Sequence, residues 1–380
     1  MKLIYFSPVR WASHRQRPHE FVAWLQQRFD ARVLWVEPYP VRLPRWQDLR
    51  RPNQQENADG TLPAWLQTIS PPALPLEPFA WGRALNRSIL WRNVTRQLQT
   101  FAATEATILA IGKPSGLALQ TLESLDAACS IYDAMDDFPA FFEGRSKASV
   151  AAIEQKIAAG VSIVCTSSSV LEQRLQAAAS TVLRVPNGLS ARRVETARVN
   201  CNVRSSQSFG YVGTIAAWFD WDWICRLARD WPERQVELIG PLFQAPRVSL
   251  PDNVRLLPAL PHEQALCRMQ SFAAGLIPFQ VNQLTAAVDP LKYYEYRGLG
   301  LSVISTPFGE MQQRSLDARV LLTDDPVVDR ARIAGLIDVH DTVADATVFC
   351  QQNDWSQRFD LLLPAMRGLF GGRFRHHLFG

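Results

Sequence analysis

Three carboxylates follow one short apolar run in the first half of the chain. Asp133, Asp136 and Asp137 lie in the stretch IYDAMDDF, where the run ends. An α/β sheet places catalytic groups at the carboxyl ends of its strands, and crowded carboxylates raise one another's pKa. Such a group suits a general base, so Asp136 is the first catalytic candidate and Asp137 the second. The alternative is a cluster that caps the start of a helix.

A second charged group lies in DPLKYYEYRGLG, residues 289–300, just before the apolar run LSVISTP. Asp289 precedes a proline that favours a helix start, and Lys292 and Glu295 follow, about one turn apart. The ordinary interpretation is an i, i+3 ion pair on a helix surface. The place where a helix meets a strand after a glycine turn favours a binding site instead. A carboxylate can accept hydrogen bonds from two hydroxyl groups, and a lysine can neutralise a bound anion.

The loop after the first apolar run holds a histidine and an arginine, in SHRQRPH. His14 is a third catalytic candidate, although a lone histidine is more often structural. Arg17, together with Asp133, is a candidate for binding an acceptor group or a phosphate. His19 is expected inside the following helix.

Short apolar runs alternate with helical stretches along the whole chain. The runs are too short for typical helices, and several are rich in β-branched residues, which is typical of buried parallel strands. In the first half the predicted strands are 2–9, 32–38, 107–112, 130–136, 161–167 and 181–188, and the predicted helices are 19–29, 115–125, 149–160 and 168–179. In the second half the predicted strands are 209–215, 235–241, 253–260, 272–280, 301–307 and 320–324. The fold class is therefore α/β with doubly wound sheets.

The restart of this alternation near residue 200 predicts two domains, as does the length of 380 residues. The first domain is expected over 1–188 and the second over 200–361, with the polar stretch 189–208 as the linker. Residues 362–380 are expected to form a C-terminal helix that packs back onto the first domain. Two such domains would face each other across a ligand cleft lined by the carboxyl ends of both sheets.

Residues 81–96, WGRALNRSILWRNVTR, interrupt the alternation after a proline-containing connection. They predict a basic amphipathic helix. One interpretation is a solvated surface helix whose aromatic face packs inward. The other is an element that binds an acceptor or a membrane surface, because Trp and Arg suit an interface.

Composition excludes several classes of protein. The 47% apolar and 20% charged residues are those of ordinary globular domains, and the net charge of +4 comes without a long basic run, so nucleic acid is not an expected partner. The six cysteines have no CxxC spacing, which favours free thiols in a reducing compartment. Neither a signal-peptide pattern nor a stretch of about 18 apolar residues occurs, so the expected location is cytoplasmic.

Several motifs, in this order, resemble those of GT-B nucleotide-sugar glycosyltransferases, especially the retaining family 4 and its relatives in bacterial cell-surface polysaccharide synthesis. The resemblance covers most of the chain and rests on NGL (187–189), YVGTI (211–215), LIGP (238–241) and PLKYYEYRGLGLSVIST (290–306), with RQRPHEF (15–21), IYDAMDDF (131–138) and DWSQRF (354–359) as features of one branch. It implies two Rossmann-like domains and sugar transfer from a nucleotide-diphosphate sugar to a glycan or lipid-linked acceptor, peripheral to the inner membrane face.

The resemblance also implies roles for residues of the second domain. Glu295 matches the acidic residue that accepts hydrogen bonds from the ribose hydroxyls. Lys292 lies where a cation can neutralise the diphosphate. Gly213 and Thr214 open the domain, where backbone N–H groups can bind phosphate. LLPALPHEQ (256–264) resembles the stretch whose backbone contacts the nucleobase.

The chain departs from the family pattern in two places. Many members have a second glutamate seven residues before the one that matches Glu295, but Val288 stands there, and Asp289, one residue on, is kept as a donor-site candidate. The arginine and lysine that many members have after the glycine turn are missing from GTIAAWFDWDW (213–223). Diphosphate binding is therefore expected to rest on backbone N–H groups, a helix N-terminus and Lys292.

Neither a metal nor an organic cofactor is expected. The DxD stretch of the sequence is DWD (220–222), and its flanking tryptophans favour helix packing. At least two of Trp218, Trp221 and Trp223 are expected in the core, and one could line the sugar or the base.

The leading expectation is thus a hexosyl- or related sugar transferase, retaining if it behaves like family 4. In a retaining enzyme the leaving phosphate could take the acceptor proton, and the carboxylates would then hold the sugar. Two alternatives stay open: a nucleotide-sugar epimerase of the same architecture, and a non-catalytic partner protein that keeps the fold. An NAD-binding dehydrogenase is disfavoured because no GxGxxG follows the first predicted strand.

Overall fold

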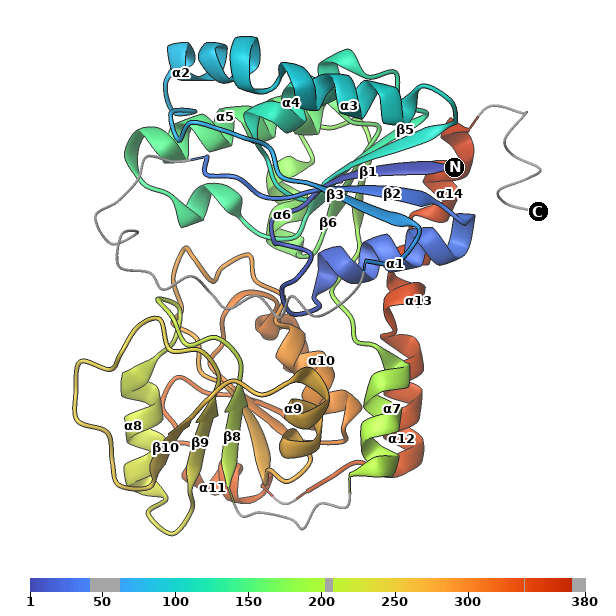
Figure 1. The fold of residues 1–380 in the computed structure, drawn as a ribbon. Helices are drawn as coiled ribbons and strands as arrows, with labels where there is room; N and C mark the ends of the chain where they lie inside the picture. Colours follow the sequence, from blue (N-terminus) through green and yellow to red (C-terminus); the bar gives the residue numbers. More distant parts are fainter. Residues whose placement is uncertain (42–61, 202–207, 338, 371–380) are drawn as a thin grey trace. The chain divides into compact units, whose positions relative to one another are not determined.

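The computed structural model describes residues 1–41, 62–201, 208–337 and 339–370, which form two compact units (Figure 1). Unit 1 comprises Met1–Val185 and the chain from Phe359 onward, and unit 2 comprises Pro186–Arg358. Part of the predicted linker, part of the proline-containing connection and the last ten residues of the predicted C-terminal helix lie outside the described residues.

Unit 1 is built on a parallel seven-stranded sheet with the order β3-β2-β1-β4-β5-β6-β7. Its strands are β1 (Lys2–Phe6), β2 (Arg32–Val36), β3 (Leu66–Ile69), β4 (Thr107–Ile111), β5 (Cys129–Ala134), β6 (Ile163–Thr166) and β7 (Val182–Arg184). Six of these strands lie in apolar runs that the sequence predicts as strands, so those predictions are confirmed. The sequence does not predict β3, because this four-residue edge strand has only one fully buried side chain.

Helices cover both faces of this sheet, and Figure 1 shows α3, α4 and α5 on one side and α1 on the other. Successive side chains of a strand point to opposite faces. Ile4 of β1 belongs to the core beneath α3, α4 and α5, whereas Tyr5 contacts Phe21 of α1. The helices are α1 (Arg17–Phe29), α2 (Ala80–Leu85), the π-helix η2 (Asn86–Leu90), α3 (Arg92–Ala102), α4 (Gly116–Ser124), the 3-10 helix η3 (Phe138–Phe141), α5 (Gly144–Gly160), α6 (Ser169–Leu175) and α14 (Leu363–Leu369).

The chain returns to unit 1 within α13 (Trp355–Asp360). Phe359 packs edge-on against Phe21 with ring centroids 5.2 Å apart, and Asp360 accepts a hydrogen bond of 2.9 Å from the indole of Trp24. These contacts attach the end of the described chain to α1.

Unit 2 contains a parallel six-stranded sheet with the order β10-β9-β8-β11-β12-β13. All six strands confirm predicted runs: β8 (Phe209–Val212), β9 (Val236–Ile239), β10 (Val254–Leu257), β11 (Ala274–Ile277), β12 (Val303–Ser305) and β13 (Val320–Leu322). The helices are α7 (Ala191–Asn200), α8 (Trp221–Asp230), α9 (His262–Met269), α10 (Leu291–Gly298), the 3-10 helix η4 (Gly309–Arg314), α11 (Arg330–Ala334) and α12 (Val343–Gln352).

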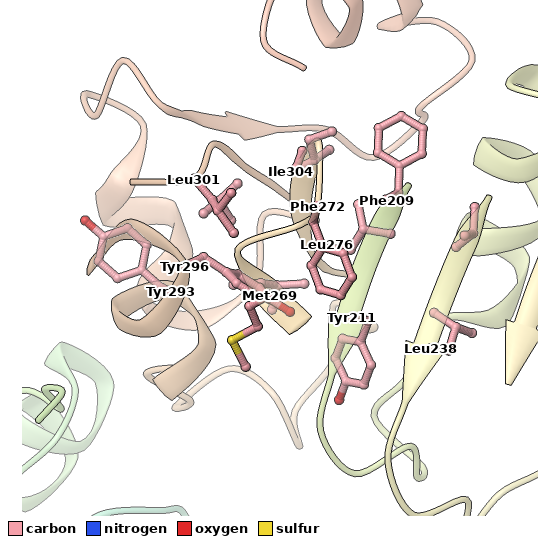
Figure 2. Close-up of a cluster of buried hydrophobic side chains, with 14 of the residues drawn as sticks. Phe209, Tyr211, Leu238, Met269, Phe272, Leu276, Tyr293, Tyr296, Leu301 and Ile304 are labelled. Atoms are coloured by element: carbon pink, nitrogen blue, oxygen red, sulfur yellow. The ribbon is translucent and has the colours of Figure 1, made fainter. Parts of the chain in front are cut away.

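Aromatic side chains fill the core of unit 2. Figure 2 shows Phe272 and Tyr296 beside β8, the strand that carries Phe209 and Tyr211. The Tyr296 ring leaves no space for a Cβ at Gly275 of β11. The Tyr296 hydroxyl accepts a hydrogen bond of 3.1 Å from the Val212 N–H at the end of β8, and these contacts fix α10 against the sheet.

The segment 189–208, expected as a linker, contains helix α7, and the boundary between the units falls before Pro186. Val194 and Ala197 of this helix are buried in the core of unit 2. The sequence does not predict this helix because only two of its ten residues are buried, so the stretch is mostly polar.

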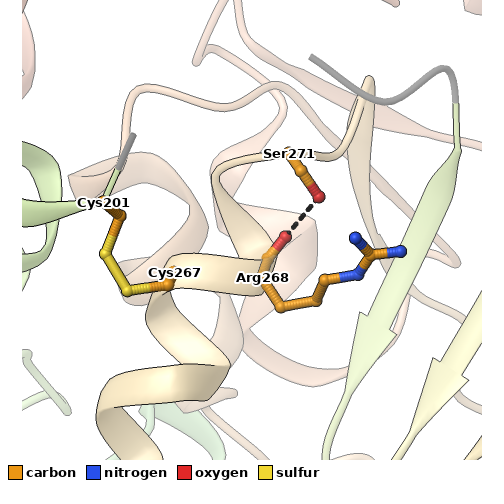
Figure 3. The surroundings of a disulfide bond; sticks show 4 residues. All are labelled: Cys201, Cys267, Arg268 and Ser271. Carbon is orange, nitrogen blue, oxygen red and sulfur yellow. Dashed lines mark hydrogen bonds between the residues drawn. A yellow bond between two sulfur atoms is a disulfide. The ribbon is translucent and has the colours of Figure 1, made fainter. Parts of the chain in front are cut away.

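Cys201 and Cys267, expected as free thiols, form a disulfide (Figure 3). Their Cα atoms lie 5.5 Å apart, a normal distance for such a bond. Spacing gives no sign of this pair because 66 residues separate the two cysteines. The other four cysteines are free and buried, as expected. In the described part of the chain, no helix has both the length and the apolar character needed to cross a membrane.

Candidate functional site

The strand order of unit 2 reverses between β8 and β11, so the loops after these two strands diverge at the carboxyl edge of the sheet. Open α/β sheets bind ligands at such a switch point. Gly213 and Thr214 directly follow β8, and Asp289 lies in the segment between β11 and α10. The predicted donor-site residues therefore lie in or beside the two loops of this switch point.

Gly213 allows the side chain of Lys292 to lie directly against the backbone. Gly213 has a φ of +148°, which residues with a Cβ rarely adopt, and the end of the Lys292 side chain occupies the space that a Cβ would take. The Tyr211 hydroxyl donates a hydrogen bond of 2.7 Å to the Thr214 carbonyl and so holds the turn.

The two predicted backbone donors at this turn differ. The Gly213 N–H donates to the Ile239 carbonyl at 2.8 Å as part of the sheet, so it is already used. The Thr214 N–H has no acceptor among the described residues. Of the pair, Thr214 is therefore the one whose N–H can bind a phosphate oxygen.

Lys292 presents a partly buried positive charge at this turn. Its Nζ lies 5.2 Å from the ring centroid of Tyr211 and 5.9 Å from that of Phe279. Burial lowers the pKa of Lys292, and the nearby Glu295 carboxylate opposes that shift. The ammonium forms no hydrogen bond or ion pair with any residue that the structure describes. Because a desolvated cation is costly without a counter-charge, this position favours a bound anion.

Glu295 contacts a histidine from a different helix. Glu295 Oε1 lies 2.8 Å from Nε2 of His262, the first residue of α9. The fold thus brings LLPALPHEQ, the stretch expected beside the nucleobase, into contact with the residue expected to bind the ribose. The sequence does not single out His262, although its position at a helix start within that stretch is a usable signal.

Asp289 has a structural role in place of the predicted contact with the donor. Its buried carboxylate accepts hydrogen bonds of 2.8 Å from the Asn187 N–H and from the Tyr294 hydroxyl, and Arg314 pairs with it at 3.0 Å. Burial raises the pKa of Asp289, and Arg314 opposes that shift. Both carboxylate oxygens are engaged, so Asp289 ties the start of unit 2 to α10 instead of facing a ligand.

The three tryptophans near 220 follow the expected division. Trp221 and Trp223 are buried in the core of unit 2, whereas Trp218 is partly exposed. Asp220 caps α8 by accepting a hydrogen bond of 2.9 Å from the Trp223 N–H, which explains DWD as a helix start. The described residues contain no group of three His, Cys, Asp or Glu side chains that could hold a metal ion.

The carboxylate of Asp136 in unit 1 has a strongly raised pKa. It follows β5 at the carboxyl edge of the sheet and is only partly exposed. Burial raises the pKa of Asp136 to about 7; Arg17 opposes the shift, and Asp133 and Asp137 add to it. A carboxylate that is partly ionised at neutral pH is well suited to accept a proton.

Asp137 belongs to a chain of polar contacts that leads into the core. It lies 3.6 Å from Arg174, which pairs with the buried Glu154 at 2.6 Å. Glu154 also accepts a hydrogen bond of 2.6 Å from the Tyr132 hydroxyl. Since Asp137 already has a cationic neighbour, Asp136 is the better placed proton acceptor.

Arg17 and Asp133, predicted to bind an acceptor or a phosphate, pair with each other in the interior. Arg17 Nε donates to Asp133 Oδ1 at 2.9 Å, and Arg17 Nη1 donates to the Val185 carbonyl at 2.9 Å. Their side chains are 3% and 0% exposed. This pair holds α1 against β5 and is not presented to a ligand.

His14 and His19 differ in environment. His14 is exposed and makes no hydrogen bond or ion pair with the described residues, so it stays a candidate without a partner. His19 is buried in the first turn of α1, where Nδ1 accepts from the Gln16 N–H at 3.3 Å and Nε2 lies 3.1 Å from the Trp11 carbonyl. Burial lowers the pKa of His19, which fits a neutral, structural imidazole.

Solved structures share this fold. Sucrose-phosphate synthase from Thermosynechococcus elongatus matches with a TM-score of 0.64 over 97% of this chain and 99% of that chain, at 13% identity. The chain has the GT-B fold. HepE from Anabaena, in complex with UDP and glucose, matches with a TM-score of 0.62 over 97% and 100% of the two chains, at 12% identity.

A third GT-B structure, alpha,alpha-trehalose 6-phosphate synthase from Burkholderia multivorans, matches with a TM-score of 0.60 over 97% and 98% of the two chains, at 10% identity. These matches confirm the predicted fold class. No protein-family profile and no curated protein sequence matches the chain.

Proposed function

We propose that this protein transfers a hexosyl or related sugar from a nucleotide-diphosphate sugar to a glycan or lipid-linked acceptor, in cell-surface polysaccharide synthesis. The observation that carries the proposal is the Lys292 ammonium at the switch point of unit 2, with Glu295 one turn further along α10. A nucleoside diphosphate offers the matching groups, an anionic diphosphate and two ribose hydroxyls. The GT-B fold, found in a protein solved with UDP and glucose, supports this assignment.

The donor half of the reaction follows from these groups. Lys292 and the Thr214 N–H would bind the diphosphate, whose negative charge grows as the bond to the sugar breaks. Because burial lowers the pKa of Lys292, an anion beside it would restore its proton affinity and strengthen the contact. Glu295 would accept hydrogen bonds from the ribose. No metal ion or organic cofactor enters this scheme.

The acceptor half involves Asp136 of unit 1. With a pKa raised to about 7 by burial, its carboxylate can take the proton of an acceptor hydroxyl near neutral pH. If the sugar is transferred with retention, as the resemblance to family 4 implies, the leaving phosphate takes that proton. Asp136 then stabilises the positive charge that develops on the sugar.

We further propose that α2, η2 and α3 dock on an anionic membrane surface at the cytoplasmic face. The inner side of this segment is fixed: the Asn86 amide exchanges hydrogen bonds of 3.0 Å with the backbone of Leu74, and the Trp91 indole donates to the Pro72 carbonyl at 3.1 Å. Trp91 is therefore buried on the inner side of the segment.

The outer side of the same segment is apolar and basic. Trp81 and Ile89 are 60% and 62% exposed, and Arg87 and Arg92 are also exposed. One α turn and one π turn together take about eight residues, so Trp81 and Ile89 lie on one side of the helix. Residues 78–104 contain no acidic side chain, which favours contact with anionic headgroups.

A non-catalytic protein of the same fold is the second candidate function. The observation that favours it is the loop after β8, which lacks the arginine and lysine of the family and uses the Gly213 N–H within the sheet. Such a protein would bind a nucleotide without turning it over.

Release of nucleoside diphosphate from a panel of nucleotide sugars, measured with a bacterial lipid extract as the acceptor source, distinguishes these functions. Release by the wild type that Asp136→Asn reduces by at least tenfold supports transfer. Nucleotide binding without any release supports the non-catalytic alternative.

A further inference from the structure

We infer that His262 is a positioning residue that orients the Glu295 carboxylate toward the ribose of a bound nucleotide, an inference that rests on the proposed function. His262 Nε2 and Glu295 Oε1 lie 2.8 Å apart although 33 residues separate them in the chain. His262 opens α9 and Glu295 lies in α10, so the contact joins two helices at the carboxyl edge of the sheet.

The surroundings of the imidazole determine which nitrogen donates. His262 Nδ1 is buried and has no hydrogen-bond partner among the described residues. A proton on Nδ1 would therefore be an unsatisfied buried donor, whereas a proton on Nε2 is satisfied by the carboxylate. This arrangement favours Nε2–H as the donor to the Glu295 carboxylate.

The contact fixes one oxygen of Glu295 and leaves the other available. Glu295 Oε2 accepts no hydrogen bond from the residues that the structure describes, and the side chain is 20% exposed. A free glutamate samples several rotamers and must be ordered when a ligand binds. Because His262 holds the carboxylate in place beforehand, the ribose hydroxyls meet an acceptor that is already oriented.

Helix α9 is itself firmly attached, so His262 has a fixed position. Cys267 is joined by the disulfide to Cys201 just beyond α7 (Figure 3). Arg268 Nε donates to Glu237 of β9 at 2.8 Å. Leu266 and Met269 are buried in the core of unit 2. A side chain carried by such a helix can position a neighbour more accurately than one on a loop.

Isothermal titration of UDP, GDP and ADP, each paired with its 2′-deoxy form, tests this role. For the ribonucleotide that the wild type binds best, we expect His262→Ala to lower the affinity about tenfold. For the 2′-deoxy form of the same nucleotide, the variant should lower the affinity less than threefold. His262→Gln, whose amide N–H can donate to the same oxygen, should bind within threefold of the wild type. In the Glu295→Ala background, His262→Ala should have no further effect, and the exposed His340→Ala serves as the matched control.

Two results would overturn the role of His262 while leaving the donor site intact: wild-type affinity in His262→Ala, or equal losses for the ribo and deoxy forms, as a structural role would give. A further loss from His262→Ala in the Glu295→Ala background would also contradict it. If the wild type binds none of the six nucleotides, the proposed function fails, and the role of His262 fails with it.

Discussion

Replacing Asp136 by asparagine should stabilise unit 1 while removing the proposed proton acceptor. Burial raises the pKa of Asp136 from 3.8 to about 7 in the folded protein. Between these values the folded state holds a proton that the unfolded state has lost, so the wild type loses stability as the pH rises from 4 to 7. Asparagine does not ionise and therefore escapes this loss.

The magnitude follows from the size of the shift. About 3 pKa units at 1.36 kcal/mol each give about 4 kcal/mol once the pH is well above 7, and nothing below pH 3.8. Between pH 5 and pH 8, the advantage of Asp136→Asn in free energy of unfolding should grow by about 2–3 kcal/mol. Titrations of groups that do not interact with Asp136 occur in both proteins and cancel in this difference.

Urea unfolding followed by tryptophan fluorescence at pH 5, 6, 7 and 8 measures this difference, with the transitions of the two units fitted separately. Asp126→Asn, at an exposed position of the same unit, is the matched control and should show no growing advantage. A stability difference that stays constant across this pH range, or a variant less stable than the wild type at pH 8, would refute the raised pKa. Higher stability combined with lost turnover is the expected signature of a functional residue.

Three further predictions concern other parts of the molecule. Arg17→Met should lower the free energy of unfolding, measured in urea, by about 3–5 kcal/mol, because it leaves the Asp133 charge buried without a partner. The double variant Arg17→Met/Asp133→Leu should recover part of the lost stability. If the single and the double variant lose the same stability, the paired charge is refuted. Lys292→Met should weaken the binding of a nucleoside diphosphate about tenfold or more in isothermal titration but leave the binding of the nucleoside unaffected. An equal loss of affinity for both ligands would refute phosphate binding by Lys292. Trp81→Ala/Ile89→Ser should reduce binding to phosphatidylglycerol-containing vesicles about tenfold. Leu316→Ser, at another exposed apolar residue, should not, and equal binding by all three proteins would refute the docking face.

The sequence predicts those features that depend on neighbouring residues. A run such as TILAIG is almost entirely apolar, so it becomes a buried strand, and twelve predicted apolar runs are strands in the structure. The edge strand β3 has no comparable run, and the mostly polar helix α7 buries two residues. Both depend on packing against parts of the chain that are distant in sequence.

Site residues follow the same rule. Lys292 and Glu295 lie one turn apart on α10, so their types and spacing alone bring them to one place. Asp289 lies in the expected loop and Arg17 opens α1, but each pairs with a residue distant in the chain, Arg314 in one case and Asp133 in the other. His262 is found only when the fold brings α9 beside α10. Long-range pairing decides whether a charged residue faces a ligand or the interior.

Thermal unfolding of the wild type and of Glu295→Ala with UDP, GDP, TDP and ADP is the measurement that tests the donor site most directly. At a concentration 100 times the dissociation constant, binding should stabilise the wild type by about 2.7 kcal/mol, or roughly 5–10 °C in Tm. We expect one nucleoside diphosphate to give such a shift and Glu295→Ala to lose most of it. The absence of a shift with all four nucleotides, or the same shift in the variant, would contradict a donor site built around Glu295.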